Sequence, residues 1–333
     1  MAEGRFKNPV IASLAGIRDF FSKQKLAERY NENQKIEGWN GLVTGANSGL
    51  GYALALNLAK RGAHVIMGCR NGIPSAGEKV RSESGSSSVE MRYLDLSRIE
   101  TIHEFCNGLE KDNIRLDLIF LNAGVALPRS RKTPSGLEEM FLVNYLSNYI
   151  LVNLLLDKNL IRMRNNGDPA PGIIVVSSDS HQGSSYIDYE EFGKYRDYGV
   201  SKGISYYSYY KLVLNTWATE LSRRINRERL KVSVNVICPG PVHSNIIREA
   251  PWLLRVILKS IFRLVFRSPA EAAKAVIYMA ISPDYANRTN EYLHMFNPKR
   301  MDEKIYIPEE GEKLWMRSAA VWKQVDRQAI INL

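Results

Sequence analysis

The sequence has few of the residues that build metal centres and disulfide frameworks. Its 333 residues include three cysteines and five histidines, all scattered, and no CxxC or Cys/His pair occurs. We therefore predict no metal site and no disulfide scaffold. The cysteines are expected to be free, buried thiols in a reducing compartment: Cys69, Cys106 and Cys238.

Long apolar runs are also missing. No stretch approaches the ~20 apolar residues that span a bilayer. The first apolar stretch, 10–16, is short and ends before Arg18, so we expect no signal peptide and a chain that stays on the cytosolic side of any membrane. Apolar spacing over 10–26 predicts an amphipathic helix in an N-terminal extension, 1–38, which either packs on the domain or faces lipid.

Charge of one sign dominates, because 45 lysines and arginines outnumber 35 acidic residues and give a net charge of +10. Such a balance favours nucleic acid, anionic lipid or a phosphorylated cofactor, although a merely basic surface would look the same. No nucleic-acid recognition motif accompanies the charge, so nucleic acid is not predicted as a partner.

Short apolar runs alternate with longer helical patterns from Gly41 onward. The runs predict strands at 41–44, 65–69, 88–93, 116–121, 172–177 and 231–237. The patterns between them predict helices at 97–111, 136–159 and 204–226. This alternation predicts a single doubly wound α/β domain of Rossmann type over 39–333, with a parallel sheet flanked by helices.

The first predicted strand runs into the glycine-rich turn TGANSGLG, residues 44–51, which opens a helix. Glycines remove the Cβ atoms that would block a pyrophosphate, and the helix N-terminus offers free N–H groups to it. The turn therefore predicts a dinucleotide site. Its cofactor-binding residues are expected to be Gly45, Asn47, Ser48, Gly49, Leu50 and Gly51.

The end of the second predicted strand indicates which dinucleotide binds. Sites for NAD place a carboxylate there to accept from the ribose 2′-hydroxyl. This chain has Cys69 and Arg70 instead, with no carboxylate nearby. An arginine suits a 2′-phosphate, so NADP(H) is predicted, unless Arg70 simply faces solvent.

These segments resemble the short-chain dehydrogenase/reductase family, and most of all its retinol dehydrogenase and protochlorophyllide reductase-like members. The resemblance extends over about 41–318. Its motifs are TGANSGLG (44–51), GCRN (68–71), YLDLS (93–97), LNAG (121–124), FLVNYLS (141–147), IVVSSDSH (174–181), YSYYK (207–211), ELSRRI (220–225), VNVICPGPV (234–242) and LWMRS (314–318).

The resemblance implies roles at the matching positions. Asp95 and Leu96 would contact the adenine, and Asn144 would hold a water chain to the active-site lysine. The other implied cofactor contacts are Asn122, Ala123, Gly124, Pro239, Gly240, Val242 and, in place of the family's usual threonine, Ser244. The helices at 136–159 and 204–226 would form the family's usual homodimer surface.

The chemistry needs a phenol whose pKa is lowered by a nearby ammonium, and Tyr-xxx-Lys puts the two on one helical face. Two matches compete, Tyr198/Lys202 and Tyr207/Lys211. We choose the second, because its distances to ELSRRI and PG resemble the family's and because Gly203 is expected to interrupt a helix after Lys202. These residues would also contact the cofactor. Ser178, with Ser177 as the alternative, would polarise the substrate oxygen.

Two segments face the expected substrate. Residues 179–206 are rich in tyrosine and form either a pocket wall or an aromatic mini-core. After PG, a helical lid at about 243–268 carries an apolar segment, 252–267, with basic residues at every fourth position: Arg255, Lys259, Arg263 and Arg267. This segment predicts peripheral membrane contact, with burial on the domain or at a dimer interface as the alternative.

The sequence therefore predicts an NADP(H)-dependent oxidoreductase of lipophilic carbonyls or alcohols, such as retinoids, steroids or aldehydes. The alternative is a non-catalytic NADP(H)-binding sensor or scaffold at a membrane. The intact set of Ser178, Tyr207 and Lys211 argues against that alternative.

Overall fold

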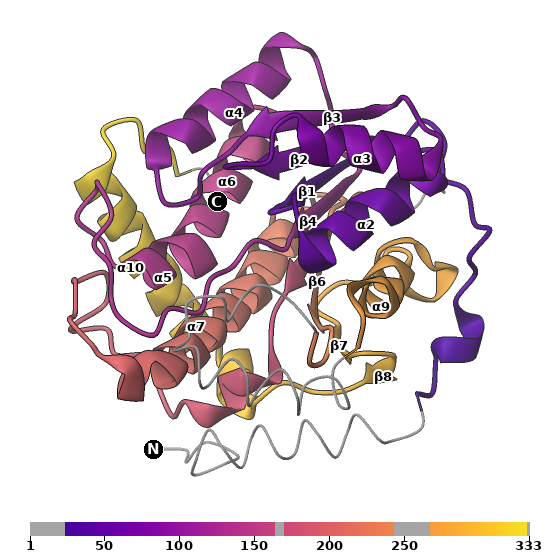
Figure 1. Cartoon of the computed structure of the whole chain (residues 1–333). Helices are drawn as coiled ribbons and strands as arrows, with labels where there is room; N and C mark the ends of the chain where they lie inside the picture. The colour runs from indigo at the N-terminus through magenta and orange to yellow at the C-terminus, as the bar shows by residue number, and fades with distance from the viewer. Residues whose placement is uncertain (1–23, 164–169, 243–266, 332–333) are drawn as a thin grey trace.

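One sheet organises the chain in the computed structural model, which describes residues 24–163, 170–242 and 267–331 (Figure 1). Its eight strands lie in the order β3-β2-β1-β4-β5-β6-β7-β8. Neighbouring strands are parallel, except that β7 and β8 pair antiparallel. The order reverses between β1 and β4, which is where open α/β sheets bind ligands. The predicted Rossmann-type fold is confirmed.

The six predicted strands are present, with small differences at their ends. They are β1 (Asn40–Thr44), β2 (His64–Cys69), β3 (Val89–Tyr93), β4 (Leu118–Leu121), β5 (Gly172–Val176) and β6 (Ser233–Cys238). The sequence pattern missed β7 (Tyr292–His294) and β8 (Asn297–Pro298), because strands this short show no periodicity. Together β7 and β8 form a hairpin at one edge of the sheet.

Helices cover both faces of the sheet (Figure 1). Side chains alternate between the faces along each strand, so Leu42 and Val43 belong to different buried clusters. The cluster of Val43 contains α2 (Gly49–Lys60), α3 (Ser75–Ser84) and α9 (Pro269–Ile281). The cluster of Leu42 contains α4 (Ile99–Lys111), α6 (Ser147–Asp157), α7 (Val200–Arg227) and α10 (Pro308–Val325).

The helix predicted at 136–159 is interrupted. It consists of a short α5 (Glu139–Phe141), one π-helical turn, η2 (Leu142–Leu146), and then α6. Among the described helices, Glu139–Asp157 is the one stretch long and apolar enough to cross a membrane, and 94% of it is buried in the protein. Such burial is typical of a core helix. Asn144 lies within the π-helical turn of this stretch.

Helix α7 begins earlier than predicted, at Val200. The expectation that Gly203 interrupts a helix is wrong, since α7 continues through it. A Cβ atom at Gly203 would lie 2.6 Å from the carbonyl oxygen of Leu127. The glycine is therefore explained by the close approach of the helix to the 127–128 backbone.

The described end of the N-terminal extension packs on the β7–β8 hairpin. The N–H of Leu26 donates to the carbonyl of Phe296 at 3.2 Å, and the N–H of Phe296 donates to Oε1 of Gln24 at 3.1 Å. The N–H of Lys25 donates to Oδ1 of Asn297 at 2.9 Å. Most of the predicted amphipathic helix at 10–26 lies outside the described residues.

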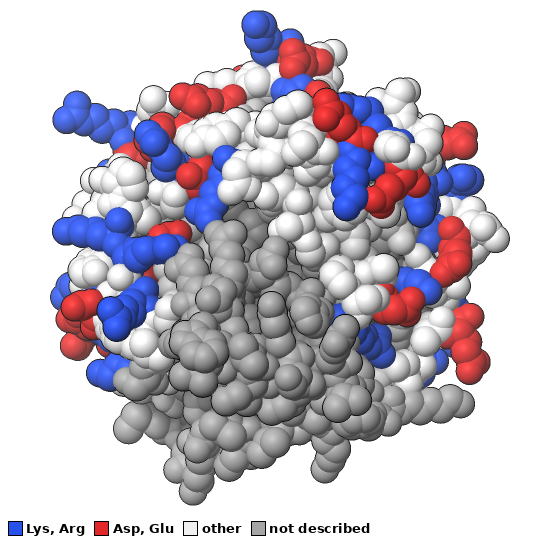
Figure 2. Space-filling model, in the orientation of Figure 1, with Lys and Arg blue, Asp and Glu red and all other residues white. Residues whose placement is uncertain are grey.

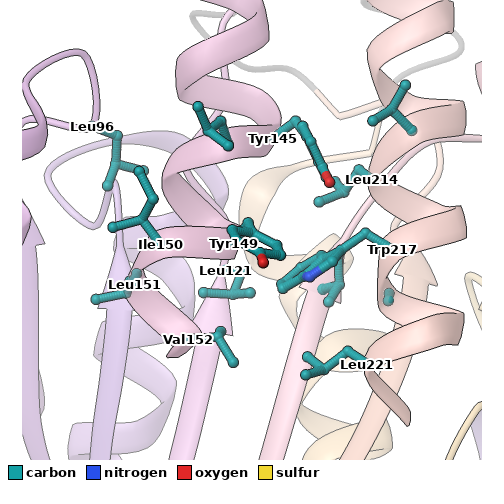
Figure 3. Packing of buried hydrophobic residues seen from close by; sticks show 14 of the residues in the cluster. Leu96, Leu121, Tyr145, Tyr149, Ile150, Leu151, Val152, Leu214, Trp217 and Leu221 are labelled. Atoms are coloured by element: carbon teal, nitrogen blue, oxygen red, sulfur yellow. The ribbon is translucent and has the colours of Figure 1, made fainter. Parts of the chain in front are cut away.

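Helix α10 packs against α6 and α7 through aromatic side chains. The ring of Tyr149 lies 4.9 Å from that of Trp315 and 6.0 Å from that of Trp322, centroid to centroid. Figure 3 shows Tyr145, Tyr149 and Trp217 converging between α6 and α7. Part of the helical surface that the family resemblance assigns to a homodimer is therefore covered by α10.

Replacing Trp322 by alanine tests this packing. Trp322 is fully buried, so we expect the free energy of unfolding to fall by about 3–5 kcal/mol, measured by urea denaturation. The matched control is Met316→Ala on the same helix, where the side chain is 65% exposed and the expected change is within about 0.5 kcal/mol. Equal losses in the two variants would contradict a core role for α10.

Candidate active site

The glycine-rich turn lies between β1 and α2, as predicted. Gly45 and Gly49 have φ angles of +66° and +57°, in the left-handed region that favours glycine. A Cβ atom at Gly51 would lie 2.3 Å from the carbonyl oxygen of Gly45. The turn is therefore tight because glycine occupies these positions, and it leaves the start of α2 facing the sheet edge.

The ends of β1 and β4 are braced beside this turn. Oγ1 of Thr44 accepts from the N–H groups of Asn122 and Ala123, each at 3.0 Å. The side-chain amide of Asn122 donates to the carbonyl of Thr44 at 2.9 Å. These bonds fix the residues that the resemblance assigns to the cofactor against the glycine-rich turn.

A cavity of about 400 Å³ opens at the carboxyl ends of the strands. It brings together the predicted site residues except Asn144 and Ser244, and Ser244 lies outside the described residues. The predicted residues that line it are Gly45, Asn47, Ser48, Gly49, Leu50, Gly51, Arg70, Asp95, Leu96, Asn122, Ala123, Gly124, Ser178, Tyr207, Lys211, Pro239, Gly240 and Val242.

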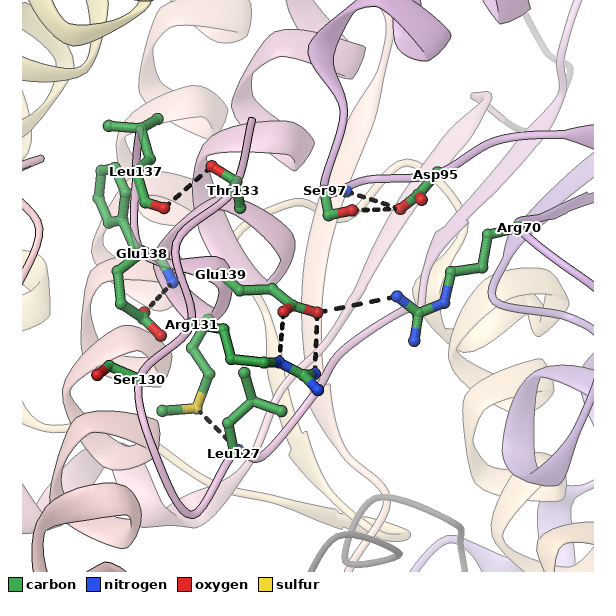
Figure 4. Close-up of polar contacts among 12 residues, drawn as sticks. Arg70, Asp95, Ser97, Leu127, Ser130, Arg131, Thr133, Leu137, Glu138 and Glu139 are labelled. Atoms are coloured by element: carbon green, nitrogen blue, oxygen red, sulfur yellow. Dashed lines mark hydrogen bonds and ion pairs between the residues drawn. The ribbon is translucent and has the colours of Figure 1, made fainter. Parts of the chain in front are cut away.

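Charged groups that sequence reasoning missed lie next to Arg70, which lines one end of the cavity (Figure 4). Nη1 of Arg70 lies 3.8 Å from Oε1 of Glu139, too far for a hydrogen bond. Arg131 binds the same carboxylate through two hydrogen bonds, at 2.7 and 3.2 Å. No signal in the sequence pairs Arg70 with Arg131 or Glu139, which lie 61 and 69 positions away, because the fold alone brings them together. Asp95 accepts from the N–H and hydroxyl of Ser97, at 3.0 and 2.7 Å.

The other end holds the chosen Tyr-xxx-Lys pair on α7. Nζ of Lys211 donates to the carbonyl of Val176 at 3.1 Å and lies 5.7 Å from the ring centroid of Tyr207. Burial raises the pKa of Tyr207 above its ordinary value, and a hydrogen bond with Ser178 partly offsets this. Oγ of Ser177 is buried without a hydrogen-bond partner in the described protein. Ser178 is thus the serine that faces the phenol.

The competing pair forms no such site. The hydroxyl of Tyr198 donates to Oε1 of Glu138 at 2.9 Å in a buried contact, while Lys202 is exposed. Much of the tyrosine-rich segment forms a mini-core, in which Phe192 packs edge-on against Phe141 with ring centroids 5.1 Å apart. Among the described residues of 179–206, none lines the cavity.

Asn144 lies next to the cavity rather than on its wall. Its side-chain amide donates to the carbonyl of Val125 and accepts from the N–H of the same residue, both at 2.8 Å. Its carbonyl accepts from the amide of Asn148 at 3.2 Å. The contacts within the described chain fix the segment after β4, and the water chain to Lys211 stays a prediction.

Lys211 is a buried charged group of the site. Burial lowers the pKa of its ammonium to about 8. The group is therefore charged at neutral pH and close to the point at which it loses its proton. A cation beside a phenol in general favours the phenolate form, which proton exchange with an alcohol or carbonyl oxygen needs. In this structure burial dominates and keeps the pKa of Tyr207 above its ordinary value.

Comparison with known proteins agrees with this geometry. The sequence profile described as short chain dehydrogenase matches residues 40–188. Human retinol dehydrogenase 14 is 33% identical over 92% of this chain and 94% of its own length. The chain belongs to the short-chain dehydrogenase family. It is thus an oxidoreductase acting on CH–OH or C=O groups.

Other relatives of this short-chain dehydrogenase have related names. Human polyprenol dehydrogenase is 29% identical over 86% of this chain and 85% of its own. Among solved structures, a putative uncharacterized protein from Mycobacterium Paratuberculosis shares the fold, with a TM-score of 0.66 at 24% identity over 87% of this chain and 95% of that one. A structure titled "Pseudomonas aeruginosa RhlG/NADP active-site complex" has a TM-score of 0.59 at 22% identity, over 80% and 97% of the two chains.

Replacing Lys211 by methionine tests the cost of this buried charge. The pKa of Lys211 falls from 10.5 to about 8 on folding, which lowers the free energy of unfolding by an amount on the order of 3 kcal/mol. This loss of stability is complete below pH 8, and it disappears as the pH rises towards 10.5. The lost hydrogen bond to Val176 offsets about 1 kcal/mol. We therefore expect urea denaturation to show a more stable variant at pH 7.

The gain in that variant should shrink between pH 8 and pH 10. Lys323→Met, at an exposed position on α10, is the matched control and should change the free energy of unfolding by less than about 0.5 kcal/mol at either pH. A gain for Lys211→Met that grows with pH would contradict this account of the ammonium.

Proposed function

We propose that this short-chain dehydrogenase uses NADP(H) to interconvert a lipophilic carbonyl and its alcohol, such as a retinoid, a steroid or a fatty aldehyde. The observation that carries the proposal is a single cavity lined by the glycine-rich turn at one end and by Ser178, Tyr207 and Lys211 at the other. That arrangement suits a dinucleotide laid across the strand ends with its reactive ring beside the phenol.

The side chains divide the chemistry between them. When bound, the nicotinamide supplies or accepts the hydride. Ser178 holds and polarises the substrate oxygen, and Tyr207 gives that oxygen a proton during reduction or takes one during oxidation. Lys211, charged below a pKa of about 8, stabilises the phenolate that Tyr207 becomes after giving up its proton.

The preference for NADP(H) rests on Arg70. It lines the cavity at the end of β2, and its ion pair with Glu139 is long, at 3.8 Å. A 2′-phosphate would offer the guanidinium shorter, charge-assisted bonds than this carboxylate does. The tight glycine-rich turn gives a pyrophosphate the close approach that either dinucleotide requires.

A lipophilic substrate is supported by apolar residues in the wall of the cavity. Val125, Ala126, Leu127 and Val143 line it, and none of them offers a polar side chain. The names of two relatives, retinol dehydrogenase 14 and polyprenol dehydrogenase, refer to lipophilic alcohols. An apolar wall and one polar corner suit an oxygen on a long or flat hydrocarbon.

We also propose peripheral contact with the cytosolic face of a membrane. The basic, apolar segment 252–267 supports it by its sequence, although only Arg267 lies within the described residues. The N–H of Arg267 donates to the carbonyl of Pro241 at 3.0 Å, so Arg267 lies beside Pro241 and Val242 at the edge of the cavity. Homodimer formation stays a prediction, and α10 covers part of the surface expected for it.

Tyr207→Phe tests the reaction. We assay aldehydes and ketones with NADPH, and sterols with NADP⁺, each with and without anionic liposomes. We expect turnover to fall by about 10²–10⁴-fold while NADPH binding persists. Tyr198→Phe, from the competing pair, is the control and should keep its turnover. A wild-type protein that binds NADPH but oxidises none with any substrate would instead support the sensor or scaffold.

Arg70→Gln tests the cofactor preference. Losing charge-assisted bonds worth about 1.5–3 kcal/mol should raise the Kd for NADPH by roughly 10–100-fold and leave the Kd for NADH within about threefold, measured by nicotinamide fluorescence. Arg131→Gln removes the other arginine of Glu139 and should have a smaller effect, because Arg131 is not among the cavity-lining residues. Equal losses for both cofactors would contradict the role of Arg70.

A further inference from the structure

The turn that carries Ser178 is held by buried polar groups that neither the sequence motifs nor the cavity explain. Ser178 follows β5 directly, and the next residue, Asp179, points away from the cavity towards the β7–β8 hairpin. Asp179 is only 6% exposed, and it is not among the cavity-lining residues. A carboxylate buried beside a reacting serine needs partners, and it has several.

Three side chains from the hairpin region converge on Asp179. Oδ1 accepts from the hydroxyl of Tyr292, and Oδ2 accepts from Nζ of Lys299 at 2.5 Å. Nδ1 of His294 lies 3.5 Å from Oδ2. Burial alone would raise the pKa of Asp179, but the charges of His294 and Lys299 outweigh burial and keep the pKa below its ordinary value. Asp179 is therefore ionised at neutral pH.

His181 provides a second anchor on the same turn. Its Nδ1 lies 2.8 Å from the carbonyl of Ser178, and its Nε2 accepts from the N–H of Asp302 at 3.4 Å. Burial lowers the pKa of His181, so the ring is neutral, with the proton on Nδ1 and donated to Ser178. Residues 292–302 thus hold the turn that carries Ser178 in two ways: they bind the side chain of Asp179, and they bind His181, which contacts the backbone carbonyl of Ser178.

The same hairpin also supports the opposite side of the nicotinamide end. A Cβ atom at Gly240, in the PG turn, would lie 2.9 Å from the sulfur of Met295. Met295 donates its N–H to the carbonyl of Cys238 at 2.7 Å. The hairpin therefore contacts both turns between which the substrate oxygen would lie.

We propose that Asp179 is a positioning residue, which fixes the hydroxyl of Ser178 by anchoring its turn to Tyr292, His294 and Lys299. The inference rests on the proposed function in giving Ser178 its role. Its physical reason is that a buried ion cluster has one good geometry, because any displacement leaves a charge unpaired. A reacting group displaced by about 1 Å loses on the order of 10²-fold in rate.

Asp179→Asn tests the inference, with NADPH and with retinaldehyde and decanal as probe carbonyls. We expect kcat to fall at least tenfold while the Kd for NADPH changes less than twofold. The decisive readout is a double-mutant cycle with Ser178→Ala. If Asp179 acts through Ser178, the double variant is no slower than Ser178→Ala, whereas losses that multiply would overturn the proposal.

Two further variants separate positioning from folding. Tyr292→Phe removes a single hydroxyl from Asp179 and keeps the ion cluster, so a smaller loss of kcat, about threefold or more, is expected with the same non-additivity towards Ser178→Ala. Asp326→Asn is the matched control, since Asp326 is a carboxylate that accepts from His103 and Trp322, at 2.7 and 2.6 Å, near the end of α10. It should lower thermal stability and leave kcat unchanged.

The outcomes also distinguish this inference from the proposed function. If Ser178→Ala is slow but Asp179→Asn and Tyr292→Phe keep the wild-type kcat, the inference fails alone. If Ser178→Ala itself keeps the wild-type kcat, both the role of Ser178 and the inference fail.

Discussion

The hydrogen bond from Lys211 to the carbonyl of Val176 joins α7, the longest of the described helices, to the central sheet at the candidate active site. An ammonium buried this deeply needs an acceptor, so α7 cannot slide along the sheet without leaving a charge unpaired. Because Tyr207 precedes Lys211 by one helical turn and Ser178 follows Val176 by two residues, one bond sets the register of all three. The charge to which we assign a role in the reaction thus also fixes the geometry of the site.

The local parts of the site were predictable from the sequence, because their chemistry depends on residues close together along the chain. The glycine-rich turn needs glycine at three nearby positions, and Tyr-xxx-Lys needs one helical turn. The wrong expectation about Gly203 has the same origin. A helix propensity describes an isolated helix, whereas Gly203 is needed here because the backbone of Leu127, on a distant segment, approaches it closely.

What the sequence could not predict are contacts between distant segments. Glu139 lies far along the chain from Arg70, and Asp179 lies more than 100 residues before Tyr292. Neither pair carries a periodic or motif signal. The hairpin of β7 and β8 is too short to be recognised, yet it supplies the partners of Asp179. Polar residues buried at the strand ends are therefore the least predictable part of the site. Their burial costs free energy of folding, and the aromatic packing of α10 helps to offset that cost.

The β7–β8 hairpin has one more attachment, to the start of the described chain. Gln24, Lys25 and Leu26 bond to Phe296 and Asn297, which lie within five residues of His294 and Tyr292. A mechanical load on the chain at Gln24 would therefore have a short route to the turn that carries Ser178, across this one hairpin, in addition to the bonds that attach residues 29–36 to other parts of the domain.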